Sequence, residues 1–470
     1  MRTRILAWTL ALAVLFPASA DALRVQQIAR LGNAEGSQRV ALVPLTNGGF
    51  VAAWDDADSG MWRATARVFD DQDAVVGEDL LCMGSSPLQS SSRAQLVRVQ
   101  SGFVLGCETY RESAITWSAT HLHRFDNRGA TVGAAIHWNT RLITQLDRLI
   151  EMSGENFAAE TAECDSEGCR YPRRIYDAST QAIGVLPIPR IRPEGLGVVP
   201  VADHRLLAVG YGPLGSGSRS TLMARRVSET GVPLERATKL GRLLVPSSPS
   251  QLVKGGGGRI AALWFSVAAA KNFILNIQMF DARGVPEGPS LEIEVPKPAE
   301  AWAGPLMALP LRRGFLVLWT PTLAGYREGI GFGRFPKTLV QAYQDSGDPI
   351  GSPAAFPDNA GGMQTAVYLE SEDAYILAST GQGFSGNGEP ASLWRLTMSS
   401  LCADVDGDQA VTTADAQRVA RAAADLESCA LCLCDLDDTG VVDGADVSLA
   451  LRIATGSSAP EQCPVCSAQE

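Results

Sequence analysis

The sequence has few of the residues that enzymes use most often for proton transfer and metal catalysis. It contains only 4 histidines among 470 residues. It also lacks a His-Glu-x-x-His pair, a Gly-x-Ser-x-Gly turn and a glycine-rich phosphate loop ending in Lys-Ser/Thr. These absences exclude zinc proteases of the HExxH type, hydrolases with a nucleophile elbow, and P-loop nucleotidases.

Positive charge is also scarce. Lys and Arg number 40 against 51 Asp and Glu, which gives a formal net charge of −11. No stretch forms the basic stripe that a nucleic-acid binder needs, so we expect no nucleic-acid partner. The acidity is concentrated near the C-terminus, where residues 402–466 hold twelve Asp and Glu against three Arg.

Long apolar runs are absent after the N-terminus. Two arginines precede the apolar run Ile5 to Phe16, and Ala18-Ser19-Ala20 follows it. This order is typical of a secretory signal peptide and predicts cleavage between Ala20 and Asp21. The run is too short to be kept as a membrane span. We therefore expect residues 1–20 to be removed and the mature protein to be extracellular, with the periplasm or the cell surface as alternatives.

Ten cysteines suit an oxidising compartment. Four lie in the body of the chain and six near its end, so each part can close its own disulfides. Cys164 and Cys169 flank a tight turn and are the best local pair. A zinc site made of Cys429-x2-Cys432 and Cys463-x2-Cys466 is the alternative, but its gap of about 30 residues exceeds the usual spacing. We expect disulfides.

The body of the chain repeats one apolar motif. Asn47-Gly-Gly-Phe50-Val-Ala-Ala-Trp54 is its clearest copy, and related stretches recur at intervals of about 50 residues. Their first apolar residues are Phe50, Phe103, Phe157, Leu206, Ile260, Phe315 and Tyr375. A second marker keeps the same interval, as in Val68-Phe69-Asp70, Arg124-Phe125-Asp126 and Met279-Phe280-Asp281.

Each repeat reads as four short strands separated by turn residues. In the first repeat these are Val40–Leu45, Phe50–Trp54, Ala64–Phe69 and Val75–Leu81. Four strands in about 50 residues, repeated about seven times, are typical of a β-propeller. We therefore predict an all-β, seven-bladed propeller over residues 21–399, with six or eight blades as alternatives. Residues on both faces of the second strand are apolar, as expected for a blade that is covered on both sides by its neighbours.

The two ends of the repeat array predict how the ring closes. The seventh repeat stops near Thr397 without a fourth strand, whereas a spare strand, Leu23 to Ile28, precedes the first repeat. Pairing the two would leave no open sheet edge. On these residues the repeats resemble a class of bacterial secreted propeller repeats with a GGFVVxW strand and an RxFDxxGxxxG strand. The resemblance implies a fold and no fixed chemistry.

Residues 400–470 contain two copies of a calcium-loop pattern, beginning at Asp404 and Asp435. Each copy places oxygen-bearing side chains at loop positions 1, 3, 5, 9 and 12, and position 7 would contribute a backbone carbonyl. The predicted ligands of the first loop are Asp404, Asp406, Asp408, Ala410, Thr412 and Asp415. Those of the second loop are Asp435, Asp437, Thr439, Val441, Asp443 and Asp446.

An apolar pattern of helical period follows each loop. It comprises Ala416, Val419, Ala420, Ala423 and Leu426 in the first copy, and Val447, Leu449, Ala450, Leu451 and Ile453 in the second. Two such loop-helix units resemble the type I dockerin module, in a cysteine-rich variant of bacterial secreted proteins. The resemblance implies two Ca²⁺ ions and docking onto a cohesin or another protein. Gln409 departs from the glycine usual at position 6.

Catalytic constellations are hard to find in the body. His121 and His123 would share one face of a strand and would permit a metal site, although a surface pair beside Arg124 is the simpler interpretation. Four carboxylates are candidates for a propeller hydrolase: Glu160, Asp203, Glu370 and Glu372. Nothing in the sequence pairs them. Trp54, Trp264 and Trp319 recur at one repeat position, which favours packing over a sugar platform.

We therefore expect a secreted, non-catalytic binding or scaffold protein. Its propeller would present a surface for a carbohydrate or protein ligand, and its calcium-loaded, dockerin-like tail would dock to another protein. One alternative is an extracellular carbohydrate-active enzyme, a glycoside hydrolase or lyase of polysaccharide catabolism that carries a dockerin. Another is a tail that only caps the propeller.

Overall fold

The computed structural model describes residues 23–32, 40–58, 61–82, 89–111, 118–138, 143–165, 168–170, 173–177, 181–185, 197–212, 221–230, 232–242, 250–267, 273–295, 306–311, 314–319, 338–347, 349–356, 363–370, 374–379, 391–398, 411–424, 426, 429, 434–436 and 441–455. The predicted signal peptide lies outside these residues. The chain separates into one compact unit, Leu23–Met398, and a second that includes Ser399–Glu470. None of the described helices is long and apolar enough to cross a membrane.

The larger unit consists of seven antiparallel sheets, which confirms the predicted seven-bladed propeller. Blade one contains β2 (Val40–Pro44), β3 (Phe50–Asp58), β4 (Met61–Phe69) and β5 (Val75–Leu81). Blade two contains β6 (Gln89–Val99), β7 (Gly102–Arg111), β8 (Ser118–Asp126) and β9 (Ile136–Trp138). Blade three contains β10 (Ile143–Glu151), β11 (Phe157–Asp165), β12 (Gly168–Arg170), β13 (Arg173–Tyr176) and β14 (Ala182–Val185).

The remaining blades follow in chain order. Blade four contains β15 (Gly197–Val201), β16 (Arg205–Gly212), β17 (Thr221–Ser228) and β18 (Thr238–Arg242). Blade five contains β19 (Ser250–Lys254), β20 (Ile260–Val267), β21 (Phe273–Phe280) and β22 (Leu291–Val295). Blade six contains β23 (Leu306–Pro310), β24 (Phe315–Trp319), β25 (Leu339–Tyr343) and β26 (Pro349–Ala355). Blade seven contains β27 (Met363–Leu369), β28 (Ala374–Ser379) and β29 (Ala391–Met398).

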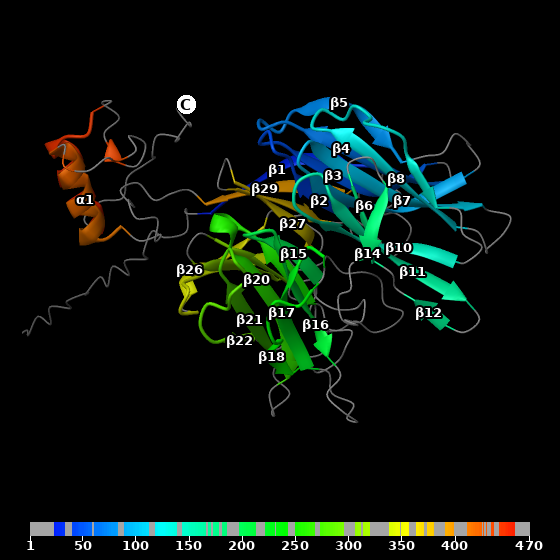
Figure 1. Cartoon of the computed structure of the whole chain (residues 1–470). Coiled ribbons are helices and arrows are strands. Elements are labelled where there is room, and N and C mark those ends of the chain that lie inside the picture. Colours follow the sequence, from blue (N-terminus) through cyan, green and yellow to red (C-terminus); the bar gives the residue numbers. More distant parts are fainter. Residues whose placement is uncertain are drawn as a thin grey trace, which may run out of the picture. The chain divides into compact units, whose positions relative to one another are not determined.

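The fourth strand of blade seven is the N-terminal strand β1 (Leu23–Leu31). It pairs antiparallel with β29, from Leu23 opposite Met398 to Leu31 opposite Ala391. Figure 1 shows this blue strand beside the orange β29. The predicted ring closure is therefore confirmed, and the strand is longer than predicted by three residues.

The two sequence markers of each repeat are cross-strand partners. Phe50 lies opposite Phe69, and their stacked rings have centroids 4.7 Å apart. Phe103 and Phe125 form the same pair in blade two at 5.2 Å. In blades one, two and six the residue before this aromatic position is a glycine (Gly49, Gly102 and Gly314), because the chain there passes close to the third strand. A Cβ on Gly102, for example, would lie 2.1 Å from the carbonyl oxygen of Phe125.

The aspartate of the second marker builds the turn after the third strand. In blade one the Oδ1 atom of Asp70 accepts hydrogen bonds from the backbone N–H groups of Gln72 and Ala74, at 2.9 and 2.8 Å. Asp126 and Asp281 accept equivalent bonds in blades two and five. This side chain satisfies backbone donors that the tight turn leaves unpaired, which explains its place in the repeat.

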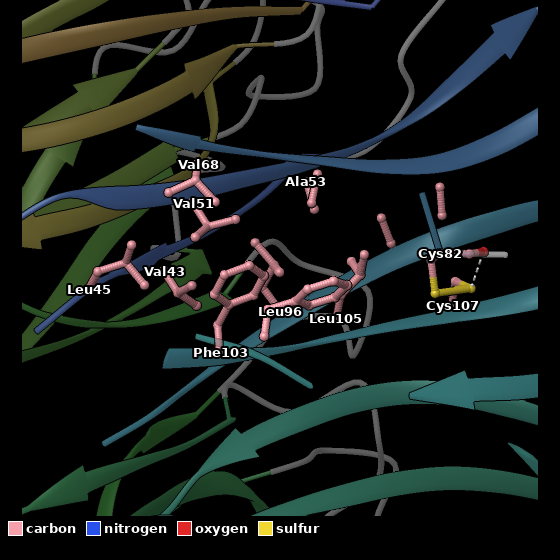
Figure 2. Packing of buried hydrophobic residues seen from close by; sticks show 14 residues of the cluster. Val43, Leu45, Val51, Ala53, Val68, Cys82, Leu96, Phe103, Leu105 and Cys107 are labelled. Carbon is pink, nitrogen blue, oxygen red and sulfur yellow. Dashed lines mark hydrogen bonds between the residues drawn. A yellow bond between two sulfur atoms is a disulfide. The ribbon is translucent and has the colours of Figure 1, made fainter. Parts of the chain in front are cut away.

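Seven clusters of buried apolar side chains lie between successive blades, including the pair formed by blades seven and one. The strand Phe50–Trp54 illustrates the arrangement. Phe50, Ala52 and Trp54 pack against blade seven, whereas Val51 and Ala53 pack against blade two. Figure 2 shows the cluster between blades one and two, to which blade one contributes Val51 and blade two contributes Phe103. Each blade therefore has two buried faces, as its sequence pattern predicts.

Polar contacts supplement this packing at the junctions between blades. Arg395 of blade seven donates hydrogen bonds from its Nε and Nη2 atoms to the carboxylate of Asp73 in blade one. Asp73 has a positive φ of 63°, in the turn where other blades have glycine. Between blades five and six, the Nη2 of Arg259 lies 2.6 Å from Oδ1 of Asp345. Both arginine side chains are largely buried.

The described part of the smaller unit contains two helices, α1 (Thr413–Ala423) and α3 (Gly444–Ala454). Their shared apolar core consists of Ala416 and Val419 of α1, Ala450 of α3, and Cys434 and Leu436, which lie between the helices in sequence. Two predicted core positions are wrong. Helix α1 ends before Leu426, which is 71% exposed, and Leu451 faces solvent because it lies beside the buried stripe of α3.

The structure contains disulfides in both units. Cys82 is bonded to Cys107, which ties the end of blade one to blade two, and Cys429 is bonded to Cys434. The second bond removes Cys429 from the alternative zinc site. The backbone places Cys164 directly opposite Cys169 across β11 and β12, as a disulfide between them would require.

Candidate functional site

The first strands of all seven blades surround one central cavity of about 1350 Å³. Its wall is mixed, with apolar side chains such as Leu42, Leu149 and Val253 beside polar ones such as Gln95 and Gln251. A cavity of this size and mixed lining suits a ligand held by both apolar contact and hydrogen bonds.

The charged side chains that line the cavity are Arg98, Arg148, Glu151, Lys254 and Glu370. Two of them form an ion pair between blades two and three. The Nη2 and Nε atoms of Arg98 donate to Oε1 of Glu151 at 2.5 and 2.9 Å. Glu151, Lys254 and Glu370 lie at or just after the ends of their strands, so these charges cluster toward one mouth of the cavity.

Sequence reasoning missed the Arg98–Glu151 pair because the two residues lie on different blades and share no local motif.

The structure does not bring together the carboxylates that the sequence offered as candidates for a propeller hydrolase. Glu160 is buried in blade three and accepts a 2.7 Å hydrogen bond from Arg173, and Asp203 lies in an exposed turn. Of the described candidates, only Glu370 lines the cavity. Glu372 lies outside the described residues.

The repeated tryptophans have a structural role. Trp54 and Trp264 are 1% exposed and pack between blades, as predicted. The side chain of Trp319 lies outside the described residues. The four glycines 255–258 form the turn between β19 and β20, and the first of them, Gly255, is tightly packed. A Cβ on Gly255 would lie 2.2 Å from the carbonyl oxygen of Pro310.

Half of the predicted calcium ligands fall within the described residues. They are Thr412, Asp415, Asp435, Val441, Asp443 and Asp446. Asp404, Asp406, Asp408, Ala410, Asp437 and Thr439 lie outside them. In both copies, loop position 9 is the helix N-cap and position 12 is an aspartate whose carboxylate accepts a hydrogen bond from the N-cap backbone. This capping box begins each helix at the end of its loop.

The second loop is described at both of its ends, and the two ends meet. Oδ1 of Asp446, at position 12, accepts a 2.5 Å hydrogen bond from the backbone N–H of Leu436, at position 2. Its Oδ2 accepts another from the N–H of Asp443, at 2.7 Å. Asp435 and Asp446 are 4% and 0% exposed. Two carboxylates are thus held out of water at the place where a loop of this spacing would hold Ca²⁺.

A histidine cluster occupies the rim of blade two. His121 in β8 lies directly opposite His137 in the edge strand β9, and their Nδ1 atoms are 2.6 Å apart. The rings of His123 and His137 have centroids 6.2 Å apart. His121 is only 8% exposed, so the prediction of a simple surface pair is wrong. Sequence reasoning missed His137 because the strand register decides which residue faces His121.

The pKa of His121 is lowered to about 4, first by burial and then by the neighbouring His137 and His123. The pKa of His123 is lowered as well, first by burial and then by His137. Both imidazoles are therefore neutral at neutral pH. Within the described residues, no three His, Cys, Asp or Glu side chains are already placed so as to hold a metal ion.

No protein-family model matches this chain, and no curated protein sequence matches it. Many solved structures are similar to it, including the following three. A protein of unknown function from Dyadobacter fermentans is 11% identical, with a TM-score of 0.42, and the match covers 80% of this chain and 100% of that one. The phage phi92 endosialidase is 8% identical, with a TM-score of 0.40 and coverage of 80% and 68%. The polysaccharide lyase Uly1 is 8% identical, with a TM-score of 0.42 and coverage of 76% and 89%.

Proposed function

We propose that the protein is a secreted, non-catalytic binding or scaffold component. Its propeller presents a surface for a carbohydrate or protein ligand, and its dockerin-like tail, loaded with two Ca²⁺ ions, attaches it to a cohesin-like or other protein partner. The tail gives the proposal its most specific support, because its spacing pattern occurs twice and each copy leads into a helix.

One observation carries the calcium assignment. The hydrogen bond from Leu436 N–H to Asp446 joins the two ends of the second loop beside the buried carboxylate of Asp435. Ca²⁺ prefers six to eight oxygen ligands, and the aspartates at positions 1 and 12 are two of them. The ion would offset the cost of burying their negative charges close together. Asp404 and Asp415 would have the same roles in the first loop.

The central cavity supports a binding role for the propeller. Both basic and acidic residues line it, and one of the basic residues, Arg98, forms an ion pair with Glu151. A wall of this kind offers hydrogen-bond donors and acceptors next to apolar surface. Polysaccharides and extended peptides both present that mixture of groups.

The test is a calorimetric titration of the mature chain with Ca²⁺, followed by circular dichroism. We expect two binding events in the full chain and none in a chain that ends at Met398. Replacing Asp435 with Ala should remove one event and leave the other, because each loop supplies its own ligands. The matched control is Asp126→Ala, which removes a turn aspartate in the propeller and should leave both events in place.

Binding of no Ca²⁺ at millimolar concentration would contradict the proposal for the tail. Docking is tested separately by passing bacterial cohesins of type I over the immobilised, calcium-loaded chain. We expect binding that is lost on adding EDTA. If no cohesin binds the chain although Ca²⁺ does, the tail is a calcium-stabilised module and the proposed docking function is wrong.

A further inference from the structure

The rim of blade two carries a pair of imidazoles that the proposed function does not use. His121 and His137 are direct partners across β8 and β9, and their Nδ1 atoms face each other at 2.6 Å. Two histidines that face each other across antiparallel strands can bind one ion between them, because each offers one ring nitrogen on the same side of the sheet. His137 lies in the edge strand and is exposed to solvent, so an ion can reach the pair from the rim.

The hydrogen bonds around His121 fix which of its nitrogens carries the proton. The hydroxyl of Thr109 donates to the backbone carbonyl of Ala119 at 3.3 Å. The same Oγ1 atom lies 2.8 Å from Nε2 of His121, and because its own hydrogen is used it accepts a hydrogen bond from that nitrogen. Nε2 carries the hydrogen, and Nδ1 presents its lone pair toward His137. Histidines that bind metals are commonly oriented in this way by a partner on the second nitrogen.

The surroundings favour a cation at this pair. At neutral pH the buried His121 and His123 are uncharged, so they do not repel an approaching ion. Arg124, the nearest cation in sequence, faces the opposite side of the strand and pairs with Glu155 of blade three. His123 lies on the same side as His121, and its buried Nε2 has no hydrogen-bond partner among the described residues.

We propose that His121 and His137 form a chelating pair for a divalent transition-metal ion, with His123 as the nearest further ligand. Imidazole nitrogen suits Zn²⁺, Cu²⁺ and Ni²⁺ and is a poor ligand for Ca²⁺, so this site is distinct in its chemistry from the tail loops. Two nitrogens bound to one Zn²⁺ lie about 3.3 Å apart, given Zn–N bonds of about 2.0 Å. The exposed His137 therefore has to move outward by less than about 1 Å. Its Nδ1 proton passes to solvent, which returns one to Nε2, and the ring stays neutral.

The experiment uses the mature full chain in millimolar Ca²⁺, which saturates the tail loops and keeps them out of the titration. Cu²⁺ is added, and its binding is followed by calorimetry and by electron paramagnetic resonance, in which imidazole ligands split the copper signal. We expect one tight Cu²⁺ site with nitrogen ligands, and weaker binding of Zn²⁺ that Cu²⁺ displaces. The variant His137→Ala should weaken the binding by at least tenfold.

The chain offers a matched control in its fourth histidine. His204 lies in an exposed turn outside the cluster, so His204→Ala should leave affinity and spectrum unchanged. Thr109→Val removes the partner that orients His121 and should weaken Cu²⁺ binding by about 10-fold to 100-fold while the melting temperature of the metal-free protein changes little. His137→Gln serves as a second variant if His137→Ala does not fold. Binding that is equal in the wild type and in a folded His137 variant would overturn the proposal, as would a copper signal without nitrogen splitting.

Discussion

The propeller and the tail are stabilised in different ways. The propeller repeats one apolar interface seven times, and each blade contributes to two of them. The tail has one small core between α1 and α3, a disulfide, and two capping boxes whose aspartates are also its predicted calcium ligands. The comparison teaches that stability in the ring depends on closure and is shared among blades, whereas stability in the tail depends on a few polar groups.

The largest effect is expected from opening the ring. Deletion of Leu23–Leu31 removes the fourth strand of blade seven and exposes the edge of β29. We expect the melting temperature of the propeller to fall by more than about 10 °C, measured by circular dichroism. Near-normal stability of the truncated protein would contradict the role of β1 in closure.

The matching deletion in the other unit is a control for this comparison. A chain that ends at Met398 should melt within about 2 °C of the full chain, if the tail is an independent module. A marked loss of propeller stability would instead favour the alternative in which the tail caps the ring.

The ion pair between the ends of the ring should have the next largest effect. Arg395→Met leaves the partly buried carboxylate of Asp73 without its partner, and their side chains are only 11% and 18% exposed. We expect a loss of about 2–4 kcal/mol in the free energy of unfolding, from urea denaturation. Arg283→Met is the control, because Arg283 is 65% exposed and its pair with Asp281 should contribute less than about 1 kcal/mol. If both variants lose the same free energy of unfolding, the ion pair between blades seven and one has no special role.

A steric change inside the ring should follow. Gly255→Ala places a methyl group against Pro310 and the hydroxyl of Tyr375, where blades five, six and seven meet. We expect the free energy of unfolding to fall by about 1–3 kcal/mol, because the surrounding backbone cannot move away easily. Gly184→Ala meets only Ile175, at 3.8 Å, and should be nearly neutral. A neutral Gly255→Ala would mean that this contact is looser than described.

In the tail, a single polar change should act locally. Asp446→Ala removes the acceptor for two backbone N–H groups, those of Leu436 and Asp443. We expect the helicity and the stability of the tail to fall, by about 1–2 kcal/mol, while the melting of the propeller is unchanged. Limited proteolysis measures the tail separately from the ring. Protection equal to the wild type would show that the capping box contributes little.

A pH effect of similar size to that of Asp446→Ala is expected from one buried histidine of the propeller. The folded protein keeps His121 neutral down to about pH 4, whereas the unfolded chain binds a proton near pH 6.5. The unfolded state therefore holds more protons in this window, and stability is lost as the pH falls from 6.5 toward 4. Urea denaturation at pH 7.5 and pH 5, without transition metals, should show this loss in the wild type and less of it in His121→Gln. An unchanged difference in the variant would show that other groups cause it.

Much of the fold could be predicted because its signals are local and repeated. Phe50 and Phe69 are cross-strand partners, and Asp70 closes the turn that follows Phe69. Because a blade needs both features, the apolar marker of the second strand and the Phe-Asp marker of the third strand recur at the same interval in the sequence. The closure by β1 followed from counting strands. Contacts between strands and between blades could not be predicted. His121 and His137 meet only once the register of β8 and β9 is fixed, and Arg98 and Glu151 meet only once blades two and three are packed together. The roles of single helix residues such as Leu451 depend on small rotations about the helix axis.

The pairing of β1 with β29 also determines the order in which the protein can be completed during synthesis. Leu23 leaves the ribosome before any blade exists, yet its partner Met398 is the last residue of the last blade. The first strand therefore has no partner until the whole ring has been made, and β29 has no partner on its outer edge until β1 arrives. A contact of such long sequence separation is slow to form and exposes strand edges in the meantime. We expect folding to need protection from aggregation until this last step, and the final gain in stability to come in a single event.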